Sequence, residues 1–183
     1  MKKLFWGLFF VFLNFNLSVN RHTLNLLPPF VCYYLLYQGA KELDGESGLF
    51  RSVRPFAVGM GVYTAVLWLG NLLGISGGSG MIGALLGLLA VLVGLYICWV
   101  LIQAIQDMEE QRAADLNSAA MKRAWVVMAM AQAVSYVCVW LLSGLALLGL
   151  LAGLVGIVML LTAFWKGQKL YEACPPRMSG PEL

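Results

Sequence analysis

Long apolar runs, each bounded by charged residues or by Gly, Ser and Pro, dominate the pattern of the chain. A helix needs roughly 20 mainly apolar residues to cross ~30 Å of hydrocarbon. Six runs approach that length, and we expect each to be a membrane-spanning helix, because an open strand edge in lipid leaves backbone groups unpaired. The predicted spans are Leu4–Val19, Asn25–Ala40, Phe56–Ile75, Met81–Gln106, Ala124–Ser143 and Leu145–Trp165.

The composition supports an integral membrane protein. Apolar residues make up 61% of the 183 residues and charged residues 11%, against roughly 45–50% and about 25% in soluble domains. This excludes a secreted domain, a nucleic-acid-binding protein and a cytosolic enzyme. The length fits one domain, so we expect an all-α transmembrane domain over residues 1–173. Residues 174–183, with three prolines, should form a disordered tail.

The basic residues test the six spans independently. If the amino terminus is cytoplasmic, 11 of the 12 Lys and Arg residues lie on the inner side and only Arg21 lies outside. The positive-inside rule therefore places both termini in the cytoplasm, with the helices arranged as three hairpins. A cleaved signal peptide at Met1–Val19 is the alternative for the first run, which lacks a small-x-small cleavage site.

Two segments of the chain resemble each other. Leu85–Gly94 reads LLGLLAVLVG and Leu147–Gly156 reads LLGLLAGLVG, nine of ten positions being identical at an offset of 62 residues. The same offset pairs Gln106 with Gln168 and Glu110 with Glu172. Either the third hairpin is a shortened copy of the second, or the shared Leu and Gly bias produces the match.

Small residues recur at spacings of three and four in three of the predicted spans, which permits close approach of helix backbones. Packing within the chain is one interpretation of this pattern, and a homodimer interface is the other. The residues are Ala57, Gly61 and Ala65, then Gly83 and Gly87, then Gly149, Gly153 and Gly156.

Chemistry-bearing residues are scarce within the predicted spans. All nine acidic residues lie outside the spans, which argues against a proton-driven pump or an acidic cation channel. His22 is the single histidine and the four cysteines form no C-x-x-C pair, so we expect no metal, no cofactor and no enzyme activity. Cys174 is a candidate for acylation at a juxtamembrane site, or an idle thiol.

Polar residues gather toward the predicted outer face. Asn14, Asn16 and His22 lie within nine residues, and Asn71 lies at a similar depth in the third run. Pro28-Pro29 should break or kink the start of the second helix. These four side chains are candidate ligand-binding residues of an outward-facing pocket. The alternative is a polar surface loop followed by a kinked helix.

A stripe of aromatic residues follows Pro28-Pro29 in the second run. Phe30, Tyr33, Tyr34 and Tyr37 recur at helical spacing. Plain packing explains such a stripe, and so does stacking against an apolar or aromatic ligand.

The segment from Asp107 to Arg123 lacks Gly and Pro and contains four Ala, two Glu and two Met residues. We expect the fourth helix to continue into it, with Asn117 or Ser118 capping the next helix. Glu109, Glu110 and Arg112 are candidate residues for docking a cytoplasmic partner. A solvated helical extension is the alternative.

Part of the chain resembles a known family. HTLNLLP at His22–Pro28 and GAKEL at Gly39–Leu43 resemble small multi-span membrane proteins of Gram-positive bacteria, over about thirty residues and with no activity implied. The six-helix plan alone is similar to the substrate-binding components of energy-coupling-factor vitamin transporters. That family carries Ala-x-x-x-Ala in its first helix, and Leu4–Val19 contains no alanine.

We therefore expect a six-helix, multi-pass protein of the bacterial inner membrane, of accessory or signalling type and without catalytic activity. The alternative is a solute-binding component of a small-molecule transporter. The expected partners are the lipid bilayer and a membrane or cytoplasmic protein, with no nucleic acid.

Overall fold

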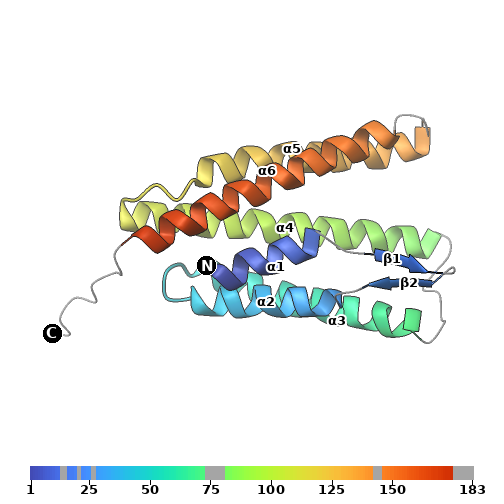
Figure 1. The fold of residues 1–183 in the computed structure, drawn as a ribbon, viewed down its shortest axis with the longest axis horizontal. Helices are drawn as coiled ribbons and strands as arrows, with labels where there is room; N and C mark the ends of the chain where they lie inside the picture. Colours follow the sequence, from blue (N-terminus) through green and yellow to red (C-terminus); the bar gives the residue numbers. More distant parts are fainter. Residues whose placement is uncertain (13–15, 20–21, 26–27, 73–80, 142–145, 175–183) are drawn as a thin grey trace. The chain divides into compact units, whose positions relative to one another are not determined.

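The computed structural model describes residues 1–12, 16–19, 22–25, 28–72, 81–141 and 146–174. Within these ranges the secondary structure is six helices and one two-stranded hairpin (Figure 1). The helical class is therefore confirmed. The elements are α1 (Lys2–Phe12), β1 (Asn16–Val19), β2 (His22–Asn25), α2 (Pro29–Glu42), α3 (Leu49–Leu72), α4 (Met81–Arg112), α5 (Ser118–Leu141) and α6 (Ala146–Ala173).

The expectation of an all-helical chain is wrong for the segment between α1 and α2. The predicted span Leu4–Val19 is instead the 11-residue helix α1 followed by strand β1, which pairs antiparallel with β2. Asparagine is a poor helix former, and β-branched Val and Thr favour strands. Hydrophobicity alone predicts one helix here, because it takes no account of these local preferences.

Helix α2 begins at Pro29, so the predicted start of the second span at Asn25 is wrong: Asn25 lies in strand β2. Pro29 occupies the first turn, where its missing N–H costs no helical hydrogen bond. The predicted break at Pro28-Pro29 is confirmed. The helix has 14 residues, so both α1 and α2 are shorter than the roughly 20 residues that a crossing needs.

Helix α3 begins at Leu49, seven residues before the predicted start at Phe56. The buried hydroxyl of Ser47 accepts a hydrogen bond from the backbone N–H of Leu49 at 3.3 Å, which satisfies one unpaired donor of the first turn. An apolar pattern alone does not reveal this polar first turn.

The later boundaries follow the sequence more closely. Helix α4 continues to Arg112, as the segment after Gln106 predicts, and α5 begins at Ser118. Helix α6 continues two turns beyond Trp165, to Ala173. The predicted tight turn at Ser143-Gly144 and the predicted tail beyond Cys174 lie outside the described residues.

Three helices, rather than the six predicted, are long and apolar enough to cross a membrane within the part of the chain that is described. The qualifying segments are Leu49–Gly70, Leu85–Arg112 and Leu151–Ala173. Large apolar side chains such as Val66, Leu89 and Leu154 are exposed along them. Broad exposed apolar surface of this kind is typical of a face that meets lipid or a partner.

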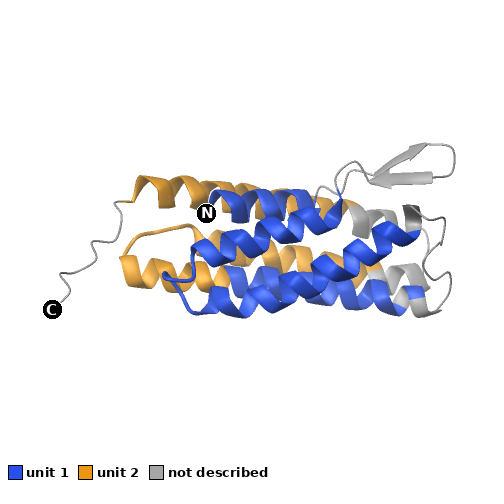
Figure 2. Cartoon of the chain, turned by 90° about the horizontal axis from the view of Figure 1, so that it is seen from below, with its two compact units in different colours: residues 1–101 blue, residues 102–183 orange. Residues whose placement is uncertain are grey.

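The chain divides into two compact units, residues 1–101 and 102–183 (Figure 2). In the first unit α2 packs against both α1 and α3. Its crossing with α1 depends on glycine: a Cβ on Gly7 would lie 2.8 Å from the backbone N of Leu36, and one on Gly39 would lie 2.6 Å from that of Leu4. Leu4 and Leu36 are fully buried at this crossing.

In the second unit α5 packs along α6. A Cβ on Gly156 would lie 2.8 Å from Cα of Met128, so the two backbones approach closely at this point. The interpretation of the small residues as packing positions within the chain is confirmed at Gly156. A Cβ added to Gly153 would meet no neighbouring atom within 4 Å, so the spacing alone does not identify the contact.

Candidate functional site

The four residues predicted to bind a ligand fall on or near the hairpin and the end of α3. Asn16 is paired with Asn25, and His22 with Val19. Asn71 lies in the last turn of α3, and Asn14 lies outside the described residues. The backbone register therefore does not pair Asn16 with His22, and a shared pocket for the four stays a prediction.

The connection from α4 to α5 is built around one carboxylate. Glu109 Oε1 accepts hydrogen bonds from the backbone N–H groups of Leu116 at 2.6 Å and Ser118 at 2.8 Å. Glu109 Oε2 accepts the hydroxyl proton of Ser118. A negative group placed against the free N–H groups of a helix start satisfies their hydrogen bonds and complements the helix dipole. Glu109 thus caps α5 from the preceding helix.

Two residues of this connection adopt positive φ. Ala113 has φ 47° and Asn117 has φ 69°. The turn at Ala113 directs the N–H of Ala114 to the carbonyl of Glu109 at 3.2 Å, which closes the end of α4. Asn117 is held by an N–H bond to Asp115 Oδ1 at 2.7 Å, and its side chain donates to the carbonyl of Ala163 at 3.2 Å. The connection is therefore tied to α6 as well as to both flanking helices.

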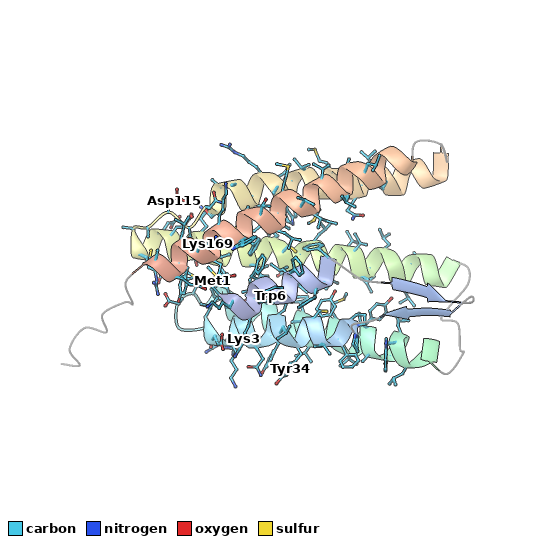
Figure 3. The ribbon with its side chains drawn as sticks, in the orientation of Figure 1. Met1, Lys3, Trp6, Tyr34, Asp115 and Lys169 are labelled. Carbon is cyan, nitrogen blue, oxygen red and sulfur yellow. The ribbon has the colours of Figure 1, made fainter. Side chains whose placement is uncertain are left out.

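The other two candidate docking residues differ in their surroundings. The Arg112 guanidinium lies 4.7 Å from the centre of the Tyr171 ring, a cation–π contact with α6. Glu110 is exposed and accepts a hydrogen bond from Gln106 at 3.5 Å. Figure 3 shows Asp115 of the connection and Lys169 of α6 at the same end of this unit. Glu109 and Arg112 hold the helix ends together, and Glu110 lies on the surface.

A groove lies between α2 and α3 in the first unit. Its volume is about 430 Å³, within the ~300–1,000 Å³ typical of small-molecule sites. Two patterns from the sequence meet here, the aromatic stripe of α2 and the small-residue row of α3, although nothing in the sequence indicated that they face each other. The lining residues are Phe30, Tyr33, Tyr34, Tyr37, Ala57, Val58, Gly61, Val62 and Ala65.

The groove is almost wholly apolar, with one polar edge. Gln38 Nε2 donates a hydrogen bond to the hydroxyl of Tyr34 at 2.8 Å. At the other end of α2, the ring of Phe30 meets Trp68 edge to face at 5.9 Å. Figure 3 shows Tyr34 on α2. Such a surface suits an elongated apolar group better than a charged solute.

Metal and thiol chemistry find little support in the described ranges. There, no three His, Cys, Asp or Glu side chains come close enough to hold a metal ion. Cys32 and Cys98 are buried free thiols, and Cys174 is a partly exposed free thiol. The acylation of Cys174 stays a prediction.

These observations define a helical protein with three helices able to cross a membrane and two distinct candidate sites, one in each unit. No family model, curated protein or solved structure matches the chain. The function must therefore be argued from the two sites themselves.

Proposed function

We propose that the chain is a multi-pass inner-membrane protein of accessory or signalling type, with both termini in the cytoplasm, that docks a protein partner and catalyses no reaction. The proposal rests on the polar end of α4, which is held in place by contacts with α5 and α6. With 32 residues, α4 is ~48 Å long at 1.5 Å per residue. Hydrocarbon takes up ~30 Å of this length, so about three turns project into water.

The projecting end is held rigidly by its neighbours. Glu109 caps α5, and Arg112 lies on Tyr171 of α6. Gln103, Gln106 and Glu110 are exposed, and their spacing of three and four places them on one face of α4. We take these three residues as the docking face. A rigid polar surface suits a partner protein because little conformational entropy is lost on binding.

Of the three predicted docking residues, only Glu110 is assigned to contact with the partner under this proposal. Glu109 and Arg112 act by holding the docking face in place. Charge reversal at Glu109 would therefore lose a partner through local unfolding, and a test of docking needs Glu110.

The experiment is mass spectrometry of the proteins that co-purify with the tagged full chain in mild detergent. We expect one partner in stoichiometric amount with the wild-type chain, and its loss with Glu110→Lys. Glu172→Lys is the matched control, since Glu172 is also exposed and also accepts a hydrogen bond from a glutamine one turn earlier. Retention of the partner by Glu110→Lys, or absence of any stoichiometric protein, would overturn the proposal.

A second candidate function is the solute-binding component of a small-molecule transporter, with an outward-facing pocket near Asn14, Asn16, His22 and Asn71. The hairpin favours it, because it interrupts the helices where these polar residues gather. In transporters, non-helical backbone at membrane depth lines a cavity. The same purification would then yield ATPase and coupling subunits or a bound small molecule. Asn14→Leu would abolish solute binding while the melting temperature stayed unchanged.

A further inference from the structure

Two basic residues lie beyond one end of the groove between α2 and α3, Lys41 on α2 and Arg51 on α3. On α2, Tyr34, Tyr37 and Lys41 follow at spacings of three and four, which keeps them on one face of the helix. On α3, Arg51 precedes Val58 by seven residues, so it too lies in line with the groove. The short connection from Leu43 to Gly48 joins these two helix ends, and Lys41 and Arg51 therefore lie at the same end of the groove.

Lys41 and Arg51 are both available to bind an anionic group. Asp44 Oδ2 lies 2.9 Å from Arg54 Nη2 and 3.5 Å from Arg51 Nη2. Arg54 forms the closer ion pair with Asp44, and the Arg51 side chain is 78% exposed. Lys41 is exposed, and its ammonium group has no ion-pair partner within the described ranges. Glu42, which follows Lys41 in the chain, forms an ion pair with Lys3.

The walls of the groove are apolar and open to the surroundings of the helices. Tyr34 is 59% exposed, Val58 50% and Val62 60%. An apolar channel that ends in two exposed basic side chains, Lys41 and the partly neutralised Arg51, matches an amphipathic molecule with an acyl chain and an anionic head. A second copy of this chain in the same membrane would bring the same basic residues to the same depth, which like-charge repulsion disfavours.

We infer that the groove between α2 and α3 binds an anionic phospholipid, with one acyl chain along Tyr34, Tyr37, Val58 and Val62 and the phosphate at Lys41 and Arg51. The inference goes beyond the proposed docking function, since it concerns the other unit and different residues. It requires only that these helices lie in a membrane.

The test is native mass spectrometry of the full chain in mild detergent, supplied with equal amounts of phosphatidylglycerol and phosphatidylcholine. We expect one phosphatidylglycerol per chain to be retained in preference to phosphatidylcholine. The double variant Lys41→Gln/Arg51→Gln should weaken that preference roughly five-fold for each charge removed. Lys122→Gln/Arg123→Gln, which removes two exposed charges from the start of α5, should leave the preference unchanged.

The acyl-chain site is tested by filling the groove. A Cβ on Gly61 would meet only Cβ of Tyr33, at an ordinary 3.6 Å, so Gly61→Leu places its side chain in the groove at little cost to packing. We expect it to abolish retention of the lipid. Gly59→Leu is the matched control, because Gly59 lies outside the groove lining and has open space around it.

Several results would overturn the inference. These are a wild-type chain that retains no lipid or retains both lipids equally, a Lys41→Gln/Arg51→Gln variant with unchanged preference, and lipid retention in Gly61→Leu. If Gly61→Leu does not fold, Tyr34→Ser at an exposed position takes its place, and unchanged retention in that variant contradicts the inference. Loss of the partner in Glu110→Lys is measured separately, so failure of one proposal is distinguishable from failure of the other.

Discussion

Leu85–Gly94 of α4 and Leu147–Gly156 of α6 are almost the same sequence in different surroundings. Both are helical. A Cβ on Gly94 would meet no atom within 4 Å, whereas one on the equivalent Gly156 would lie 2.8 Å from the backbone of Met128. Local sequence specifies the helix in both segments, and the neighbouring element decides which glycine is required.

The likeness extends along both helices without extending to their contacts. Gln106 donates to Glu110, and the equivalent Gln168 donates to Glu172. The two helices also end within one residue of equivalent positions. However, Glu109 caps α5, and its equivalent Tyr171 receives the Arg112 guanidinium. The likeness is one of local structure, and a true duplication of the hairpin stays a prediction.

The largest expected effect comes from adding one methyl group to each glycine. Gly156→Ala forces a Cβ against Cα of Met128, and backbone cannot yield as a side chain can, so we expect a loss of about 3 kcal/mol in the free energy of unfolding. Gly94→Ala has open space and replaces a poor helix former, so it should gain up to about 1 kcal/mol. Thermal unfolding in detergent, followed by circular dichroism, measures both.

A lower free energy of unfolding in Gly156→Ala together with a higher one in Gly94→Ala would support the difference in packing. Equal effects in both variants would break the comparison, because they would mean that the two glycines have the same surroundings. Gly153→Ala provides an internal control on α6, since a Cβ there meets nothing within 4 Å.

The next effect is at the end of α4, where the two segments no longer match. Glu109→Ala removes three hydrogen bonds to the start of α5 and leaves those donors unpaired. We expect a loss of about 2 kcal/mol, in line with charged hydrogen bonds and helix caps. Glu110→Ala removes one long, exposed bond within α4 and should cost less than about 0.5 kcal/mol.

Equilibrium unfolding of both variants in detergent separates these values. Hydrogen exchange at the first turn of α5 should rise in Glu109→Ala alone. A Glu109→Ala variant as stable as Glu110→Ala would show that the carboxylate does not cap α5.

The sequence predicted those features of the fold that depend on neighbouring residues. The break at Pro28-Pro29, the continuation of α4 beyond Gln106 and the restart of the chain at Asn117-Ser118 follow from local chemistry. The predicted start of the second span at Asn25 was wrong, because Asn25 lies in β2. The hairpin at Asn16–Asn25 was missed, because hydrophobicity outweighed the strand preference of a short segment. The close contacts of Gly7 and Gly39 were missed too, since a lone glycine carries no sign of its partner.

The candidate sites also combine features that local sequence predicts with features that depend on how the helices pack. The aromatic stripe and the small-residue row were each visible in the sequence, but their meeting in one groove depends on how α2 packs on α3. Glu109 was expected to face a partner. Its true role as a cap depends on the turn that returns the chain through Ala113 and Asn117, both at positive φ without glycine. No spacing rule predicts such a turn.

The smallest expected effect concerns that turn. Ala113 closes α4 at φ 47°, where a Cβ crowds the backbone and glycine is the usual residue. Ala113→Gly relieves the strain but gives the unfolded chain more freedom, so we expect a net gain of about 0.5–1 kcal/mol, measured by thermal unfolding. At Ala114 φ is not positive, so Ala114→Gly should be destabilising. A loss of stability in Ala113→Gly would mean that α4 ends without a left-handed residue. The cap from Glu109 would then need another explanation, because this turn brings Leu116 and Ser118 back to that carboxylate.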